Sequence, residues 1–387
     1  MAAVTAPSLP PMGRLIPPDW VKPISAGGRA MLDLLLKRGP QSQAALSRLL
    51  DLSQPSVHRL VSGFENDGML HTSSRAPTGR GNPSVMIALE ADFAYGLGIA
   101  LVADAVSMAL VDFTGSVRFR QTVAMPDMCR VAVAAQLVKM KRQLIKATKI
   151  DPSRIVGAGV GFSGFLAGSP PSFNPPDLLS DWLGIDVAET LVPSLGVSVI
   201  CDNDGTTAAI AESLLGVGRT CPTFAYCHLT NGFGGGLVID GSIIRGTLGN
   251  AADFGGVWAL LADGYPNLER LRIHIESHGM TFDTIEDMVQ AIEPGTAGVD
   301  TWVAEAIGPF TTLARLLGHI VAPEKVVIGG RLPGWLADQL AGAITMPFVP
   351  TRNDMPFPLP AVVAREVDDD SVAIGAGIMP LQALFLA

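Results

Sequence analysis

The chain has 387 residues, of which 48% are hydrophobic and only 6% aromatic, and its formal net charge is −9. This length predicts two or three domains, and the composition is typical of a well-packed α/β protein rather than a fibrous or disordered chain. No run of about 18 apolar residues predicts a membrane span, and no signal sequence opens the chain. We therefore expect a cytoplasmic protein with no membrane partner.

The charge is divided unevenly along the chain. Residues 20–89 hold eight lysines and arginines against four aspartates and glutamates, whereas residues 90–387 hold eighteen against thirty-one. A small basic segment on a large acidic body indicates that only the small segment meets a polyanion.

Residues 1–25 contain six prolines and no apolar periodicity, so we expect a disordered or loosely packed arm. Residues 26–90 form the first predicted domain. A helix over residues 28–38 ends at Gly39-Pro40, and Ser42 and Ser53 are the expected N-caps of two further helices.

The third of these helices has a complete apolar stripe, because Val57, Leu60, Val61 and Phe64 follow the i, i+3, i+4, i+7 spacing. Two short strands, over residues 69–71 and 84–89, are expected after it. Three helices and a two-stranded wing predict a winged helix-turn-helix domain. A small helical domain with a solvated polar face is the alternative.

The exposed side of the third helix and the loop of the wing hold the candidate DNA-binding residues. Their polar and cationic side chains are of the kind that contacts base edges and phosphates. They are Gln54, Ser56, His58 and Arg59 on the helix, with Arg75 and Arg80 in the loop.

Residues 91–387 form the body. Strands are expected over residues 95–103, 105–112 and 117–123, and the same plan recurs over residues 223–246. This weak internal repeat predicts two similar lobes that face each other. The other expected elements are helices over residues 129–148 and 206–215, strands over residues 155–162, 197–201 and 326–328, a long helix that contains Phe310 and Ala314, and a final helix after Ser371.

Two stretches of the body have the composition of binding sites. Gly232, Gly234, Gly235 and Gly236 leave main-chain N–H groups open to an anion, although a purely structural turn has the same composition. Asn203 and Asp204 follow a predicted strand, where ligand-binding residues of open α/β sheets lie. An aspartate there accepts a hydrogen bond from a sugar hydroxyl, acts as a base, or only caps the next helix.

The glycine-rich stretch over residues 229–256 resembles the second glycine-rich hairpin and sugar loop of the ROK family of repressors and sugar kinases. Leu52-Ser-Gln-Pro-Ser-Val57 and Gly79-Arg-Gly-Asn-Pro83 resemble the DNA-binding domain of ROK repressors, which usually have a second arginine where Asn82 stands. The resemblance covers residues 27–387. It implies an α/β fold in which a winged helix-turn-helix precedes a two-lobed, actin-like (ribonuclease-H-like) body of the sugar-kinase type.

The resemblance also implies a set of sugar-binding residues. ROK kinases have an Asn-Asp pair whose aspartate is the catalytic base, so Asp204 is identified as a vestigial base position. The implied sugar-binding residues are Asn174 in a substrate-side loop, Asn203, Asp204, Asp253 where the family usually has a glutamate, and Glu269 after the family's zinc motif.

The departures from the family pattern concern ATP and zinc. ROK kinases hold Mg²⁺ and the ATP phosphates with Asp-x-Gly-Gly-Thr, where this chain has Ala100-Leu-Val-Ala-Asp104, and Asn231 replaces the usual threonine of the second loop. Gly256 stands at the position of the zinc histidine, and residues 262–267 contain no cysteine. We therefore expect no metal, no ATP cofactor and no catalytic residue.

These observations together predict a transcription regulator, a repressor of carbohydrate metabolism, whose degenerate kinase domain senses a sugar or a sugar derivative. Its expected partners are double-stranded operator DNA, the sugar or sugar derivative, and further copies of the chain in a homodimer or a higher homo-oligomer. An active ATP-dependent sugar kinase with an appended head is the alternative, and residues 100–104 count against it. A protein-interaction module that binds no DNA is a third hypothesis. The identity of the sugar and the direction of the response do not follow from the sequence.

Overall fold

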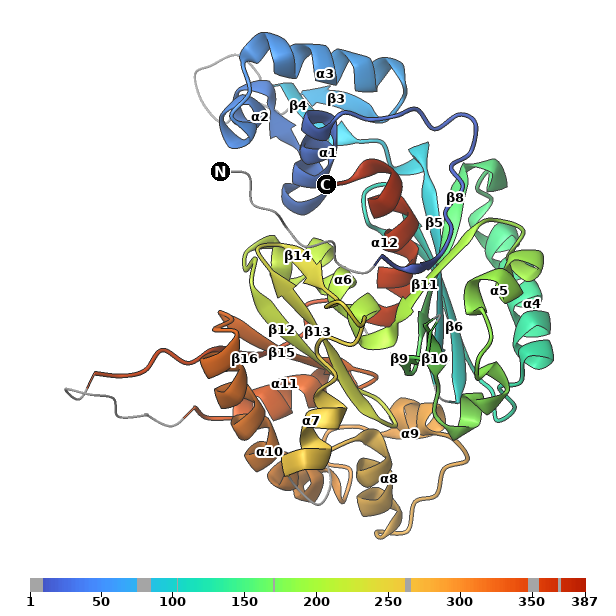
Figure 1. Cartoon of the computed structure of the whole chain (residues 1–387), viewed down its shortest axis with the longest axis vertical. Coiled ribbons are helices and arrows are strands. Elements are labelled where there is room, and N and C mark those ends of the chain that lie inside the picture. The colour runs from blue at the N-terminus through green and yellow to red at the C-terminus, as the bar shows by residue number, and fades with distance from the viewer. Residues whose placement is uncertain are drawn as a thin grey trace.

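The structure is a computed structural model that describes residues 10–74, 85–102, 104–169, 171–261, 266–346, 355–367 and 370–387. Figure 1 shows a small helical head at one end of the molecule and a body of two lobes, each with its own sheet. Within the described residues, no helix has the length and apolar character that a membrane crossing requires.

The head consists of α1 (Ala26–Arg38), α2 (Gln43–Leu50) and α3 (Gln54–Asn66), with a three-stranded sheet beside them. Ser42 and Ser53 accept hydrogen bonds from Ala45 and Ser56 backbone N–H groups, as expected of N-caps. The sheet order is β2 (Gln41–Ser42), β4 (Val85–Leu89) and β3 (Leu70–Ser74), so a short strand before α2 adds to the predicted wing. The predicted wing residues Arg75 and Arg80 lie outside the described residues.

Lobe 1 has a six-stranded sheet in the order β1-β11-β8-β5-β6-β7. Helices α4 (Arg130–Thr148) and α5 (Val187–Leu195) cover one face, and α6 (Asp204–Leu215) and α12 (Ser371–Phe385) cover the other (Figure 1). The strands are β1 (Met12–Gly13), β5 (Tyr95–Val102), β6 (Ala105–Asp112), β7 (Val117–Ala124), β8 (Ile155–Phe162) and β11 (Val199–Asn203). A small hairpin of β9 (Phe165–Ala167) and β10 (Ser172–Asn174) follows β8.

Lobe 2 has a five-stranded sheet in the order β14-β13-β12-β15-β16. Its strands are β12 (Phe224–Leu229), β13 (Phe233–Ile239), β14 (Ser242–Ile244), β15 (Lys325–Gly330) and β16 (Ala361–Ala364). Its helices are α7 (Phe254–Leu261), α8 (Leu268–Glu276), α9 (Ile285–Ala291), α10 (Val299–Ile320) and α11 (Gly334–Ala343). The repeated hairpin plan is confirmed, because β5-β6-β7 and β12-β13-β14 are both antiparallel runs of three strands.

Helix α6 lies at the junction of the two lobes. Every one of its residues except Leu215 is buried. Its first turn touches β13 of lobe 2 backbone to backbone, since a Cβ on Gly205 would lie 2.6 Å from the Gly235 carbonyl oxygen. Its middle packs equally closely on α12, where a Cβ on Gly375 would lie 1.9 Å from the Thr207 carbonyl oxygen. Glycine is required at these positions because any side chain would separate the elements.

The expectation of a loose arm over residues 1–25 is wrong for the part that the structure describes. Met12 and Gly13 pair with Cys201 and Ile200 as an antiparallel edge strand of lobe 1. Trp20 then packs edge-on against Phe93 with ring centroids 5.4 Å apart. The prolines therefore limit helix formation in this segment without keeping it from packing.

The head and lobe 1 share a hydrophobic core. Met31, Leu32 and Leu35 of α1 belong to the same buried cluster as Phe113 and Phe385 of the body. The head is therefore fixed on lobe 1 by apolar packing along α1, while α3 lies on the side away from the body (Figure 1).

Candidate functional site

A cavity of about 660 Å³ lies between the two lobes and is called the large cavity below. Lobe 1 contributes the ends of β8, β10 and β11 and the start of α6, and lobe 2 contributes the β12–β13 turn and the loop before α7. Its polar lining consists of Ser163, Asn174, Asp177, Asn203, Asp204, Thr206, His228, Thr230, Asn231, Asn250 and Asp253. Many neutral and acidic acceptors thus surround one volume of the size of a small-molecule site.

Asp204 is the first residue of α6 and is buried in the wall of the large cavity. Its Oδ1 accepts a hydrogen bond from the Gly205 N–H at 2.8 Å, and its Oδ2 accepts one from Ser163 Oγ at 2.5 Å. These two donors fix the orientation of the carboxylate. The predicted position of Asp204 at a strand end in the cleft is what the structure shows, and Ser163 is a partner that the sequence did not indicate.

Asn203 serves chiefly as the cap of α6. Its Oδ1 accepts from the Thr206 N–H at 3.1 Å, and its Nδ2 donates to the Gly164 carbonyl oxygen at 2.8 Å. The side chain lines the large cavity, but these two bonds occupy its carbonyl and one of its amide hydrogens. Asn203 therefore holds the β11–α6 junction in shape beside Asp204.

His228 reaches the large cavity from the second-last position of β12 and was not anticipated from the sequence. Its Nε2 lies 3.8 Å from Asp204 Oδ2, and the side chain is almost completely buried. Neither ring nitrogen has a hydrogen-bond partner within the described part of the chain. Burial lowers the pKa of the imidazole, which favours the neutral ring beside Asp204. The sequence signal that could have indicated this residue was a histidine within an otherwise mostly apolar strand.

Two of the four glycines of the predicted anion loop have a packing role. Gly232, Gly234 and Gly235 line the large cavity, but Gly234, Gly235 and Gly236 are part of β13 and pair with β12. A Cβ on Gly235 would lie 2.4 Å from the Phe254 ring, and one on Gly236 would lie 2.4 Å from the Ala209 side chain. Close packing against α6 and α7 therefore explains Gly235 and Gly236 without a bound anion, whereas a Cβ on Gly232 or Gly234 would meet no close neighbour.

The remaining predicted sugar residues divide into two groups. Asn174 and Asp253 line the large cavity, and Asp253 also caps α7 by accepting from the Gly256 N–H at 3.1 Å. Glu269 is not among the lining residues. Its carboxylate forms an ion pair with Arg272 one turn further along α8. The structure therefore brings together four of the five predicted residues and directs the fifth elsewhere.

Asn250 joins the two lobes across the large cavity. Its side-chain Oδ1 accepts from the Leu166 N–H at 2.7 Å, and its Nδ2 donates to the Leu166 carbonyl oxygen at 2.8 Å. The amide thus pairs with β9 as a neighbouring strand would. This reciprocal pair holds the loop before α7 against the β9–β10 hairpin.

The described lining of the large cavity contains acidic side chains and no permanently cationic ones. Asp177, Asp204 and Asp253 line it, and none of the described lining residues is a lysine or an arginine. The nearby cation Arg245 is engaged by Asp202, whose carboxylate lies 2.7 Å from its Nε. Such a wall favours a neutral, hydroxyl-rich molecule and repels a phosphorylated one.

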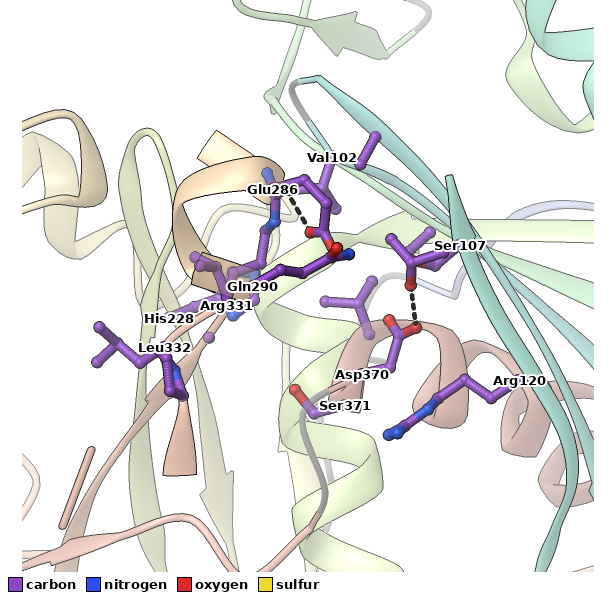
Figure 2. Close-up of a pocket in the computed structure, with 17 residues that line it drawn as sticks. Val102, Ser107, Arg120, His228, Glu286, Gln290, Arg331, Leu332, Asp370 and Ser371 are labelled. Carbon is purple, nitrogen blue, oxygen red and sulfur yellow. Dashed lines mark hydrogen bonds and ion pairs between the residues drawn. The ribbon is translucent and has the colours of Figure 1, made fainter. Parts of the chain in front are cut away.

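A second cavity of about 340 Å³ lies between the lobes on the other side of His228 (Figure 2). Arg331 of lobe 2 lies at its edge and donates to Asp104 of lobe 1 at 2.7 Å and to Glu286 of α9 at 2.8 Å. Asp104 also accepts from the Ile285 N–H at 2.6 Å. Asp370 on the opposite wall bonds to Thr122 at 3.0 Å, and burial raises the pKa of its carboxyl group.

This ion-pair cluster includes Asp104, which lies in the turn between β5 and β6. In ROK kinases the residues that hold the ATP phosphates lie in this hairpin, and the sequence predicted that they are missing here. Arg331 forms ion pairs with the carboxylates of both Asp104 and Glu286. Among the described residues, no group of three or more histidines, cysteines or carboxylates is arranged to hold a metal ion. Arg331, Asp104 and Glu286 are thus engaged with one another, while Arg120 and Asp370 also line this second cavity.

The exposed part of α3 carries three of the predicted DNA-binding side chains. Gln54, His58 and Arg59 are exposed on the first two turns of this helix, and the helix itself lies away from the body (Figure 1). Ser56 differs, because its Oγ lies 2.9 Å from Ser53 Oγ and belongs to the helix cap. The predicted recognition surface is therefore a compact group near the N-terminus of α3.

Known families match both parts of the chain. The ROK family matches residues 96–263, and the IclR helix-turn-helix domain matches residues 28–74. An uncharacterized protein of Sinorhizobium fredii, y4fQ, is 23% identical over 94% of this chain and 92% of its own. The xylose repressor of Bacillus subtilis is 22% identical, and the matched part spans 59% of each protein.

Solved structures share the fold. A ROK family transcriptional regulator, described as a homolog of the E. coli MLC protein, has a TM-score of 0.58 at 19% identity, over 93% of this chain and 96% of its own. A ROK family glucokinase from Streptomyces griseus, solved with glucose and AMPPNP, has a TM-score of 0.57 at 18% identity, over 75% of this chain and 100% of its own.

Fold and site together define a two-lobed body of the sugar-kinase type with a winged helix-turn-helix head. A ROK family match over residues 96–263 thus lies behind an IclR-type helix-turn-helix match over residues 28–74, and the chain is similar to a xylose repressor in sequence and to a ROK family transcriptional regulator in fold.

The first prediction concerns the carboxylate in the large cavity. Asp204→Asn keeps the shape but removes the charge that strengthens a hydrogen bond from a ligand hydroxyl, so sugar binding should weaken by about 1.5–3 kcal/mol. Calorimetric titration with D-glucose and D-xylose measures this. Asp240→Asn, in the exposed β13–β14 turn, makes the same chemical change outside the cavity and should leave binding unchanged. If the wild type and both variants bind the sugar with equal affinity, Asp204 does not contact the sugar.

Proposed function

We propose that this chain is a repressor of carbohydrate metabolism that binds operator DNA through α3 and takes up a sugar or sugar derivative in the large cavity without phosphorylating it. The observation that carries the proposal is the combination of the two sites. A basic recognition surface is fixed on a body whose cavity is rich in hydroxyl-binding groups. Similarity to a xylose repressor and to ROK sugar kinases supports a sugar as the ligand.

The lining of the large cavity supports an uncharged or weakly charged sugar. Each Asp204 oxygen can accept a further hydrogen bond beyond those from Gly205 and Ser163. A molecule without hydroxyl groups leaves that capacity and the Asn174 side chain unused, and this loss makes such a site selective. Three aspartates without a described cation would repel a phosphate group. We therefore propose free sugars, rather than sugar phosphates, as the ligands.

A thermal-shift screen tests this choice of ligand. A molecule that binds only the folded protein raises its melting temperature by mass action. D-xylose, D-glucose and related free sugars should include at least one that raises it, whereas the corresponding 5- or 6-phosphates should not. A shift by a sugar phosphate alone would contradict the proposed charge selectivity, and no shift by any sugar would contradict the proposed ligand class.

The DNA-binding prediction concerns Arg59. Its exposed guanidinium on α3 is placed to contact a base edge or a phosphate. Arg59→Ala should weaken binding to the DNA upstream of the protein's own gene by about 1–3 kcal/mol if the contact is to a base edge. Gel shifts at fixed salt measure this change.

Arg142→Ala provides the matched control, because Arg142 is an exposed arginine on α4 of the acidic body. It removes the same charge and should not change DNA binding. Wild-type affinity in Arg59→Ala, or an equal loss in both variants, would contradict the assignment of α3 as the recognition helix.

We also propose that the body does not transfer phosphate from ATP. The supporting observation is the cluster of Asp104, Arg331 and Glu286, which leaves these groups paired with each other instead of free for a metal or a nucleotide. The kinase alternative requires a free acid at this hairpin. No specific feature of the described residues favours it.

A coupled ATP-consumption assay with the sugars of the thermal-shift screen tests this point. We expect no turnover above background for the protein with or without its head. Phosphorylation of any of these sugars at about 1 s⁻¹ or faster, which lies within the usual range of kinases, would establish the kinase alternative instead.

A homodimer completes the proposal. Two heads related by a two-fold axis match a palindromic operator, and most soluble oligomers are symmetric in this way. Light scattering of the purified protein, with and without operator DNA, measures the number of copies.

A further inference from the structure

The two ends of α1 are attached to lobe 1 by separate segments. The first is the strap, defined here as residues 10–25, which leads into the N-terminus of α1. The second is α6 with the 3-10 helix η4 (Val217–Arg219), which contacts the C-terminus of α1. Both segments start from the junction of β11 and α6, where Asn203 and Asp204 line the large cavity.

The strap is joined to the cavity strand itself. Met12 and Gly13 pair with Cys201 and Ile200 of β11, two to three residues before Asn203. Gly13 has φ +85°, and a Cβ on it would lie 2.6 Å from both the Ala188 Cβ and the Val199 carbonyl oxygen. Only glycine therefore allows the strap to lie this close to β11.

The strap then follows lobe 1 to the head. The Ile16 N–H donates to Ser198 Oγ at 3.2 Å, and the Trp20 indole N–H donates to the Ser153 carbonyl oxygen at 3.3 Å. Lys22 forms an ion pair with Asp67, the C-cap of α3. Ser25 finally caps α1. The strap thus touches the body, the recognition helix and α1 in succession.

Helix α6 makes the second connection as a rigid unit. Its first turn contributes Asp204 and Thr206 to the large cavity, and its buried Glu212 accepts N–H bonds from Val217, Glu366 and Val367 near its other end. Twelve residues of helix span about 18 Å, so the element reaches from the cavity to the head.

At the head, α6 and η4 contact the last turns of α1. Arg219 Nε donates to the Lys37 carbonyl oxygen at 2.7 Å. The side chains of Leu215 and Leu36 both approach Gly115, where an added Cβ would lie 2.4 Å and 3.1 Å from them. A shift of α6 along its axis would therefore press directly on the C-terminal half of α1.

We propose that the β11–α6 junction is the relay between sugar and DNA: a ligand that binds Asp204 moves β11 and α6, and the strap and η4 pass this movement to opposite ends of α1. This inference rests on the proposed function of the two sites. Because packed interiors do not compress, a small shift at the junction changes the orientation of α1, and with it the orientation of α3 on DNA.

Helix α12 is a third attachment of the head but has a different role. Arg29 of α1 donates to the Ala383 and Leu386 carbonyl oxygens near the end of α12. No residue of α12 is among those that line the large cavity. It therefore contacts the ligand site only indirectly, through elements such as α6, on which it packs backbone to backbone at Gly375 and Thr207.

Two variants interrupt the relay outside both binding sites. Gly13→Ala places a Cβ against Ala188 and Val199 and should detach the strap, and Arg219→Ala removes the bond to Lys37. Gly184→Ala and Arg142→Ala are the matched controls. Gly184 also has a positive φ, +70°, but open space around it, and Arg142 is exposed on α4.

The experiment measures operator affinity with and without D-xylose or D-glucose, whichever raises the melting temperature, together with the affinity for that sugar. For the wild type, a ratio of operator affinities of about 5- to 150-fold is typical of such coupling. We expect Gly13→Ala and Arg219→Ala to bind the sugar as the wild type does and to move this ratio toward one. The controls should keep the wild-type ratio.

Hydrogen exchange of the wild type gives a second measurement that does not depend on the variants. Adding the same sugar should change amide exchange in residues 10–25 and 26–38, because both carry the movement. If the wild type shows no effect of sugar on DNA binding, the proposed function fails. If the wild type responds but the variants keep its ratio, or lose the sugar itself, or if exchange in residues 10–38 does not change, the relay is wrong.

Discussion

The close approach of α6 to β13 determines where every polar group of the large cavity lies. Gly205 and Gly235 meet backbone to backbone, which brings the end of the lobe 1 sheet against the hairpin of lobe 2. Asp204 and His228 come from different lobes, yet this contact places their charged and neutral groups 3.8 Å apart. A side chain at either glycine would separate the lobes and open the site, so the glycines determine the geometry without touching a ligand.

The second constraint is the burial of charge between the lobes. Removing Asp104, Glu286 and Arg331 from water costs free energy that their mutual attraction only partly recovers, so such a cluster is weak evidence for stability. It does specify how the lobes meet, because an unpaired member would remain buried and charged. Arg331 also reaches Asn231, which lines the large cavity, at 3.3 Å. The ion-pair cluster between the lobes thus also fixes one wall of the large cavity.

The sequence was sufficient for features that depend on local patterns. The caps Ser42 and Ser53, the stripe of α3 and the strands around β5–β8 follow from residue type and spacing, and the structure shows them. Asp204 was also found, because the end of a strand is a position that spacing can locate. The features that were missed depend on contacts between distant segments. A two-residue strand such as β1 has no periodicity, and whether Glu269 faces the large cavity depends on how α8 packs, although its i, i+3 ion pair with Arg272 is local.

The charge distribution explains why the attachment of the head to the body matters for DNA binding. A body with thirteen more acidic than basic residues is repelled by DNA, so the head must hold it at a distance set by α1. Apolar packing on α12 alone would fix α1 along one side and leave it free to tilt. The strap and η4 attach both its ends, and both lead back to the carboxylate in the large cavity. The orientation of the recognition helix is therefore a property of the β11–α6 junction as much as of the head itself.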